Sequence, residues 1–368
     1  MSGKEAGFGA AWSDGWRRVA LVNPTKFLGN LLIGGGLIQD FADHCRLQGI
    51  DLLLVLDERF RSLVEDAFGD LQIVWYPRDQ IARAGQVQAA RLWYDCVKQI
   101  RSFRADLAFA IEEDSVCHQL TLFSGATHRV SSTRERHRFG FHQVLPVNRI
   151  ERPPGQEHIW FSHAEVLQRL GVQTAAQPFY LRFPEVTGTS ALPEMLVSPE
   201  PGRPLALLHA GATKPYKRWP LSHFQALAEK LSRQGYALAL IGAGAVDREA
   251  NASIMAACQK LGLQPMPQDL SDQLDLSQLG ELMQKASLIV GNDSGPVHLA
   301  AALSVPGVVL FGPTDQRLWG PLSARVRVLA KPGLCAPDCQ RRRCRLQWRC
   351  LSGITAEDVM ASLPVSGG

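Results

Sequence analysis

The segment richest in residues that can bind a phosphate is ASLIVGNDSGPVHLAAALSVPGVVLFGPTD, residues 286–315. An apolar strand runs into the turn at 291–295, and a helix of small residues is predicted to begin at about Pro296. Such a turn directs several backbone N–H groups and a helix N-terminus to one point, which suits a diphosphate. Asp293 opposes a phosphate unless its carboxylate faces a hydroxyl, a protein donor or a cation. The alternative is a turn in which Ser294 only caps the helix.

A second candidate segment is LALLHAGATKPYKRWPLSHFQALAEKL, residues 205–231. A predicted strand over 205–211 is followed by a basic loop that contains Lys217, and then by a helix over 222–234 with Ser222 as its cap. A lysine at the carboxyl end of a parallel strand lies where α/β folds bind ligands, and its ammonium can neutralise a departing phosphate. A solvated basic loop is the alternative.

Three adjacent carboxylates in the first half of the chain are candidates for general base chemistry. Glu112, Glu113 and Asp114 follow the predicted strand ADLAFAI, at the end where ligands bind. Because adjacent carboxylates repel one another, one of them is favoured as a proton acceptor near neutral pH. An ordinary exposed acidic loop is the competing interpretation.

A dense set of cations follows in the run HRVSSTRERHRFGFH, residues 128–142, and Lys26 lies in an earlier loop. Guanidinium groups bind phosphate and carboxylate groups bidentately, so this run can bind an anionic ligand, or it can be a solvated loop. The arginines that we single out are Arg129, Arg134, Arg136 and Arg138.

Four of the eight cysteines crowd into the tail segment CAPDCQRRRCRLQWRC. Four thiolates this close can hold Zn²⁺ or iron tetrahedrally, and a reducing compartment favours metal over disulfides. The spacing is not that of a recognised zinc ribbon, so free thiols and disulfides stay open. The candidate structural metal ligands are Cys335, Cys339, Cys344 and Cys350.

Short apolar runs that alternate with amphipathic stretches must position these residues. Continuous apolar runs suit strands covered on both faces by helices, so we predict an α/β architecture. The segment 183–204 is rich in Pro, Gly, Ser and Thr, as in a linker between two domains. The predicted strands are 19–24, 50–57, 71–77, 105–111, 205–211, 236–242, 287–293 and 307–313. The predicted helices are 28–47, 222–234, 247–261, 296–303 and 355–363, the last capped by Thr355.

Composition bounds the class of protein. The chain has 368 residues, of which 46% are hydrophobic, so it is too long for one ordinary core and too apolar for disorder. A formal net charge of +4 does not indicate a nucleic-acid partner. The first residues lack the apolar core of a secretory signal, which predicts a cytoplasmic location. The uncharged stretch 294–314 is interrupted by Gly-Pro and Pro-Gly, so we predict no membrane span.

These segments together resemble glycosyltransferase family 9, the heptosyltransferases of lipopolysaccharide core assembly. The resemblance is carried by GNDSGPVHLAAAL followed by PGVVLFGPTD, by HAGATKPYKRWP upstream, and by the cysteine tail followed by LSGITAEDVMASL. It implies a GT-B fold, in which two Rossmann-like domains face a cleft. The implied domains are an acceptor-binding domain over 1–185, a linker over 186–204, a nucleotide-sugar domain over 205–350, and a C-terminal helix and tail over 351–368.

The resemblance also implies roles for particular residues. Asp293, Ser294 and Gly295 match the turn that holds the donor diphosphate and sugar, and His298 stands one helical turn further on. Lys217 matches the lysine that meets the phosphates, and Thr213 the hydroxyl residue beside them. Either Asp247 or Glu249 matches the acidic partner of the ribose.

One position departs from the family pattern. The family usually has Gly-Asp in the first loop, where the aspartate is the general base, but here Asn30 follows Gly29. An amide cannot take up a proton at neutral pH. We therefore expect Asp114 or Glu113 to replace the base, or catalysis to be lost.

The resemblance implies an inverting transfer of a heptose from an ADP-sugar, with no cofactor required for catalysis. The implied acceptor is a lipopolysaccharide core or lipid A precursor at the inner leaflet, bound by Asn30, Lys26 and the arginines of 128–142. The alternatives are a catalytically impaired relative that still binds nucleotide-sugar, and a heptosyltransferase that modifies proteins.

Overall fold

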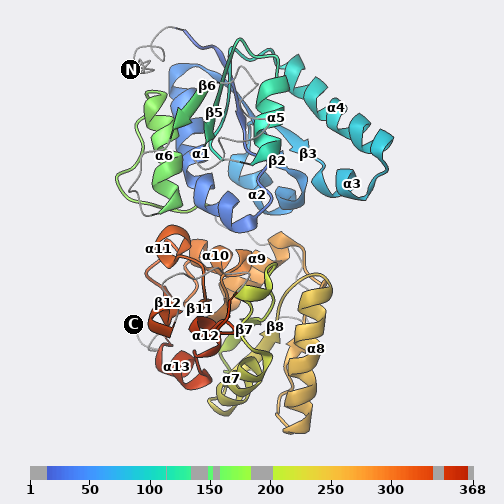
Figure 1. Cartoon of the computed structure of the whole chain (residues 1–368), viewed down its shortest axis with the longest axis vertical. Coiled ribbons are helices and arrows are strands. Elements are labelled where there is room, and N and C mark those ends of the chain that lie inside the picture. The colour runs from blue at the N-terminus through green and yellow to red at the C-terminus, as the bar shows by residue number, and fades with distance from the viewer. Residues whose placement is uncertain are drawn as a thin grey trace. The chain divides into compact units, whose positions relative to one another are not determined.

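The computed structural model describes residues 15–112, 114–133, 148–151, 158–183, 202–334 and 344–363. Contacts divide the chain into two compact units, Met1–Pro184 and Glu185–Gly368. Each unit is built on its own parallel sheet with helices packed against it, as Figure 1 shows. The predicted α/β class is confirmed.

The sheet of the N-terminal unit has the strand order β3-β2-β1-β4-β5-β6, with all neighbours parallel. Because the order reverses between β1 and β4, the loops after these strands flank the point where open α/β sheets bind ligands. The strands are β1 (Arg18–Val22), β2 (Asp51–Asp57), β3 (Gln72–Tyr76), β4 (Leu107–Ala110), β5 (His128–Thr133) and β6 (Asn148–Glu151).

Helices cover both faces of this sheet (Figure 1). Apolar side chains of α4 and α5 join those of β1, β2 and β4 in one core cluster, while α1 packs against α6. The helices are α1 (Leu28–Gln48), η2 (Glu58–Phe60), α2 (Arg61–Phe68), α3 (Arg78–Arg83), α4 (Gln86–Ser102), α5 (Ser115–Phe123) and α6 (Ile159–Arg169).

The sheet of the C-terminal unit has the order β12-β11-β10-β7-β8-β9, again parallel. Its switch lies between β7 and β10, which pair directly. The strands are β7 (Leu205–His209), β8 (Ala237–Leu240), β9 (Gln268–Asp269), β10 (Leu288–Asn292), β11 (Gly307–Phe311) and β12 (Val326–Ala330).

A cluster built on Trp219 and Phe224 joins α7, α8 and α13 to one face of this sheet, and α9 packs against α10. The helices are η6 (Pro215–Lys217), α7 (Leu221–Arg233), α8 (Ala245–Lys260), α9 (Leu276–Lys285), α10 (Gly295–Ala302), α11 (Gln316–Trp319), η7 (Pro332–Leu334), α12 (Arg349–Ser352) and α13 (Ala356–Ala361). Among the described residues, no helix is long and apolar enough to cross a membrane.

The helix starts test three predicted caps. Thr355 caps α13 in a capping box with Asp358, as predicted. Ser222 is not a cap: α7 begins at Leu221 after Pro220, with no side-chain cap. Ser294 occupies the N-cap position of α10, but its side chain makes no cap hydrogen bond, so its hydroxyl serves another contact.

Candidate active-site residues in the two units

The carboxyl ends of β7 and β10 are tied together by a buried asparagine. Gly291 of β10 is in register with His209 of β7, and Asn292 follows with no exposed surface. The Asn292 Oδ1 accepts from the Trp219 backbone N–H at 2.9 Å, and its Nδ2 donates to the Ala210 carbonyl at 2.8 Å. The loop after β7 and the turn after β10 are thus held against each other.

A lysine and an aspartate from these two segments form an ion pair. Lys217 Nζ lies 2.6 Å from Asp293 Oδ2, and only 5% of the Asp293 side chain is exposed. The Asp293 carboxylate therefore faces a cation, which was one of the conditions for a phosphate at this turn. An ammonium has three N–H donors, so Lys217 keeps hydrogens for a second anion.

A buried histidine links this turn to the first turn of α8. Ser294 Oγ lies 2.9 Å from His209 Nδ1 and 2.9 Å from the Asn292 carbonyl oxygen. His209 Nε2 lies 3.6 Å from Asp247 Oδ1. Burial lowers the pKa of His209, although the Asp247 carboxylate opposes the shift, so the imidazole is neutral at pH 7.

The other predicted donor residues lie on the same elements. Gly295 opens α10, and His298 is buried one turn further along that helix. Thr213 is exposed in the loop after β7. Of the two candidate carboxylates on α8, Glu249 is exposed and Asp247 contacts the buried His209. The structure therefore brings Asp247 to the edge of the sheet and leaves Glu249 on the helix surface.

In the N-terminal unit, Asn30 contacts a carboxylate, and it is the position at which this sequence departs from the pattern of the family that it resembles. Asn30 Nδ2 donates to Glu112 Oε2 at 3.3 Å, and Glu112 is 5% exposed. Asn30 lies in the first turn of α1 after β1, and Glu112 follows β4, so both lie near the switch point of this sheet. Glu113 falls outside the described residues.

Asp114 is committed to other contacts. Its Oδ1 accepts from the Val116 N–H at 2.9 Å and so caps α5. Its carboxylate also lies 3.9 Å from both Lys26 Nζ and Arg78 Nη2. The Lys26 side chain is half exposed and lies over the Phe27 ring.

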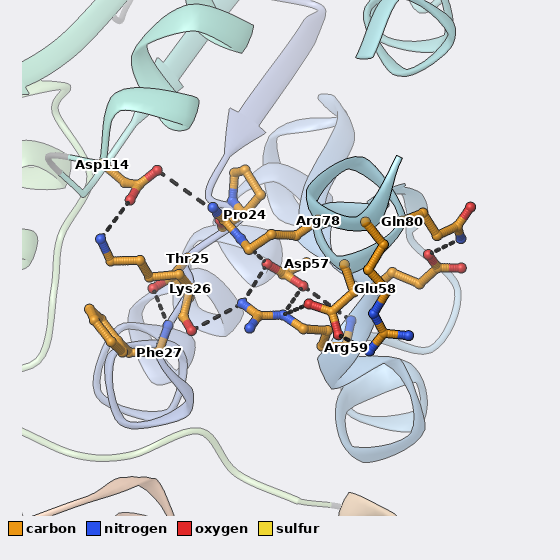
Figure 2. A network of polar contacts seen from close by, with 12 residues as sticks. Pro24, Thr25, Lys26, Phe27, Asp57, Glu58, Arg59, Arg78, Gln80 and Asp114 are labelled. Atoms are coloured by element: carbon orange, nitrogen blue, oxygen red, sulfur yellow. Dashed lines mark hydrogen bonds and ion pairs between the residues drawn. The ribbon is translucent and has the colours of Figure 1, made fainter. Parts of the chain in front are cut away.

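A fully buried aspartate organises the loop that carries Lys26 (Figure 2). Asp57 accepts from Arg59 Nε at 2.9 Å and from Arg78 Nε at 2.5 Å. Arg59 Nη2 in turn donates to the Lys26 carbonyl at 3.0 Å, and Arg78 Nη2 donates to the Pro24 carbonyl. The loop between β1 and α1 is thereby fixed through its backbone.

The remaining acceptor-side predictions are placed only in part. Arg129 lies on β5, where its Nη1 donates to the Leu122 carbonyl at the end of α5 at 3.0 Å. That guanidinium is partly used within the unit. Arg134, Arg136 and Arg138 fall outside the described residues.

The cysteine tail is likewise placed in part. Cys344 is half-buried and its Sγ accepts from the Trp348 N–H, while Cys350 is buried, and both are free thiols. Cys335 and Cys339 fall outside the described residues. No group of three potential metal ligands occurs among the residues that the structure describes. The metal site stays a prediction.

His209, Asp57 and its two arginines were not assigned roles from the sequence. A signal exists for the first two, because each is a polar residue that directly follows the apolar run of a strand, in LALLH and DLLLVLD. The partners Arg59 and Arg78 carry no such signal, since arginines at the start of a surface helix are common.

Comparisons with known proteins agree with the resemblance. A model of glycosyltransferase family 9 (heptosyltransferase) matches residues 93–348. Lipopolysaccharide heptosyltransferase 2 of Escherichia coli K12 is 31% identical over 236 residues, which are 62% of this chain and 66% of that enzyme. Lipopolysaccharide heptosyltransferase 1 of Pseudomonas aeruginosa is 31% identical over 189 residues, 51% of this chain and 50% of that enzyme.

The chain thus spans about half to two thirds of the length of these curated relatives. The solved structure of the E. coli ADP-heptose lipopolysaccharide heptosyltransferase II has a TM-score of 0.68 to this chain at 22% identity. That match covers 93% of this chain and 96% of the other. The likeness is one of fold, and it confirms the GT-B fold class.

Proposed function

This chain belongs to glycosyltransferase family 9, and from that premise we propose that it transfers a heptose from an ADP-sugar to a lipopolysaccharide core acceptor. The observation that carries the proposal is the ion pair between Lys217 and the buried Asp293, which directly precedes the N-cap of α10. It places a cation beside the N-terminus of α10, where the first backbone N–H groups of a helix have no intrahelical partner, and such an arrangement suits a diphosphate. Both similar curated enzymes carry lipopolysaccharide heptosyltransferase as their name.

We assign the donor to the C-terminal unit. The diphosphate would lie at the turn Asp293–Ser294–Gly295, with Lys217 neutralising the charge that develops as ADP leaves. Thr213 lies in the loop between β7 and η6, and His298 lies on α10. We assign the role of acidic partner of the ribose to Asp247 rather than to Glu249, because Asp247 contacts the buried His209 and Glu249 lies on the helix surface.

We assign the acceptor and the general base to the N-terminal unit. Glu112 is favoured over Asp114, because the Asp114 carboxylate caps α5 and lies between Lys26 and Arg78. A carboxylate accepts hydrogen bonds only, so Asn30 turns its amide nitrogen to Glu112 and orients it. Lys26 and the arginines of 128–142 would bind the anionic groups of the acceptor.

The proposed step is one inverting displacement. Glu112 takes the proton of the acceptor hydroxyl as that oxygen forms a bond to the anomeric carbon of the donor. The bond from this carbon to the phosphate oxygen breaks, and ADP leaves with the electron pair. General base catalysis of this kind contributes about 10²- to 10⁴-fold to the rate. No catalytic metal or cofactor enters the step.

The acceptor in this proposal is anchored to lipid, so the protein would work at the inner leaflet of the membrane. Co-sedimentation with vesicles that contain the acceptor, compared with vesicles that lack it, tests that location. Binding to neither kind of vesicle contradicts it.

The test of function is incubation with ADP-heptose and truncated core acceptors, followed by mass spectrometry. We expect a mass increase of one heptose on one acceptor, and a strongly reduced yield of that product with the Lys217→Ala variant. The second candidate, a relative that binds the donor without transfer, is favoured by Asn30 at the usual aspartate position. Binding of ADP-heptose with no transfer to any core acceptor would select it.

A further inference from the structure

His209, the last residue of β7, contacts the segments that follow both neighbouring strands, β10 and β8. Its Nδ1 lies 2.9 Å from Ser294 Oγ in the turn after β10, and its Nε2 lies 3.6 Å from Asp247 Oδ1 at the start of α8. The ring is 4% exposed. The proposed function uses the Ser294 turn but gives this histidine no role.

The Asp247 carboxylate lies in a space that is open because two neighbouring residues are glycines. A Cβ on Gly211 would lie 1.4 Å from Asp247 Oδ1, and a Cβ on Gly242 would lie 2.5 Å from the Asp247 Cβ. The Ala243 N–H donates to Oδ2 at 2.8 Å, while Oδ1 is buried without a hydrogen-bond partner. The backbone thus holds the Asp247 carboxylate against His209. Its Oδ1 oxygen can accept a hydrogen bond from the imidazole.

The contacts that join Asn292, Ser294, His209 and Asp247 need more hydrogens than these groups carry when His209 is neutral. The Ser294 hydroxyl has one hydrogen, which goes to the Asn292 carbonyl, to His209 or to a ligand. If it goes to a ligand, the bond to His209 needs a hydrogen on Nδ1. The Asp247 carboxylate can only accept, so it needs a hydrogen on Nε2. Only the imidazolium carries both hydrogens.

We propose that His209 is a positioning residue of the donor site that takes up a proton when the diphosphate binds, with Asp247 as its counter-ion. Its Nδ1–H then holds the Ser294 oxygen, and the hydroxyl hydrogen turns to a phosphate oxygen. The proton comes from solvent. This inference rests on the proposed function, because it needs the donor diphosphate at the Ser294 turn.

The surroundings of His209 support a proton that arrives with the ligand. Burial outweighs the attraction of Asp247 and lowers the pKa of His209, which favours the neutral ring. Asp293 is already neutralised by Lys217, and a diphosphate adds negative charge beside the ring. The loop after β7, η6, α8 and α10 also carry the charged or titratable side chains of Lys214, Tyr216, Arg218, Arg248, Glu249, Cys258, Lys260 and His298.

Calorimetric titration with ADP-heptose tests the inference. The diphosphate of this donor is a diester and does not titrate near neutral pH, so a proton change belongs to the protein. Binding is measured at pH 7.5 in buffers of different ionisation enthalpy. We expect uptake of up to one proton per site, and affinity that falls by up to about tenfold per pH unit above neutrality.

His209→Asn is the diagnostic variant, because the amide nitrogen can donate to Ser294 but does not titrate. It should bind the donor with no proton uptake and with flat pH dependence. Asp247→Asn removes the counter-ion, and should reduce the uptake at pH 7.5. His223→Asn, at a half-buried histidine of α7 that contacts the Ile354 carbonyl, is the matched control and should keep the uptake.

The outcomes separate the inference from the function on which it rests. Donor binding without proton uptake in the wild type overturns the role of His209 and leaves the donor site intact. Undiminished uptake in His209→Asn, or in Asp247→Asn if the first variant does not fold, also overturns it. A wild-type protein that does not bind ADP-heptose overturns the proposed function and this inference together.

Discussion

The amide nitrogen of Asn30 lies 3.3 Å from Glu112 Oε2, which joins the residue at the usual aspartate position to a carboxylate after the neighbouring strand. If Glu112 is the general base, Glu112→Gln lowers kcat by about 10²-fold or more with little change in the donor KM. Glu113→Gln, which alters the adjacent carboxylate, is the matched control. Steady-state kinetics with ADP-heptose check both, and full turnover by Glu112→Gln contradicts the assignment.

Exchanging the two side chains is a sharper test of the same pair. In the double variant Asn30→Asp with Glu112→Gln, the carboxylate moves to the helix and the amide to the strand end, so the hydrogen bond is kept with reversed direction. We expect the double variant to recover at least about tenfold over Glu112→Gln alone. Recovery that is no better than the single variant would show that the base lies elsewhere.

Asn30→Asp alone should move the pH profile. It places a second carboxylate beside Glu112, and two like charges this close disfavour ionisation of the pair. The form able to accept a proton is then present only at higher pH. The acidic limb of the kcat profile should therefore shift upward, and an unchanged limb would separate the pair from the reaction.

Asp114 is expected to matter for stability rather than turnover. Asp114→Ala removes the cap on Val116 N–H, which costs about 1 kcal/mol, so Tm should fall by about 2–4 °C. Asp114→Asn keeps a capping oxygen and should keep both Tm and kcat. Thermal melts and turnover of the two variants check this, and a large loss of kcat in Asp114→Asn would restore Asp114 as the base.

These carboxylates show where reasoning from the sequence ends. The strand ADLAFAI and the edge at which it ends were predictable, because a continuous apolar run can be recognised without any partner. The contacts of Asp114 depend on Val116, Lys26 and Arg78, which approach it only in the folded unit. Sequence therefore located the acidic edge and preferred Asp114 or Glu113 over Glu112.

The candidate donor segment was more predictable, because its residues are contiguous. The turn 291–295 and the helix after it follow from Gly, Asn and Pro at fixed offsets. The contact between Lys217 and Asp293 could be suspected from the carboxylate's need for a cation. The contacts from Ser294 through His209 to Asp247 could not be predicted. They join segments that follow three different strands, and they depend on glycines that leave space for the carboxylate.

Lys217 and Asp293 can be separated by a double variant. If Lys217 neutralises the departing ADP as proposed, Lys217→Met should lower kcat by about 10²- to 10³-fold. It should also lower Tm, because Asp293 is left buried without its counter-charge. Adding Asp293→Asn removes that charge and should restore Tm without restoring kcat. If turnover returned together with Tm, Lys217 would serve only the fold.

Native alkylation will test the cysteine tail against an internal standard. Burial raises the pKa of Cys45 and of Cys96 to about 12, and also raises the pKa of Cys117 and Cys258. At pH 8 these four thiols are almost entirely protonated, and the thiolate is the reactive form. Iodoacetamide should therefore leave them unmodified in the native protein, as read by peptide mass spectrometry, and modification at any of them without unfolding would contradict their burial.

The tail cysteines then report on the metal. A metal bound by Cys335, Cys339, Cys344 and Cys350 should protect all four from iodoacetamide until a chelator is added, because a coordinated thiolate is not free to attack. Elemental analysis of the protein before the chelator is added should give about one Zn or Fe per chain. If Cys335 and Cys339 react at once in protein that contains no metal, the tail holds free thiols and the metal site is refuted. Failure to react both before and after chelation, with reaction only after reduction, would instead identify disulfides.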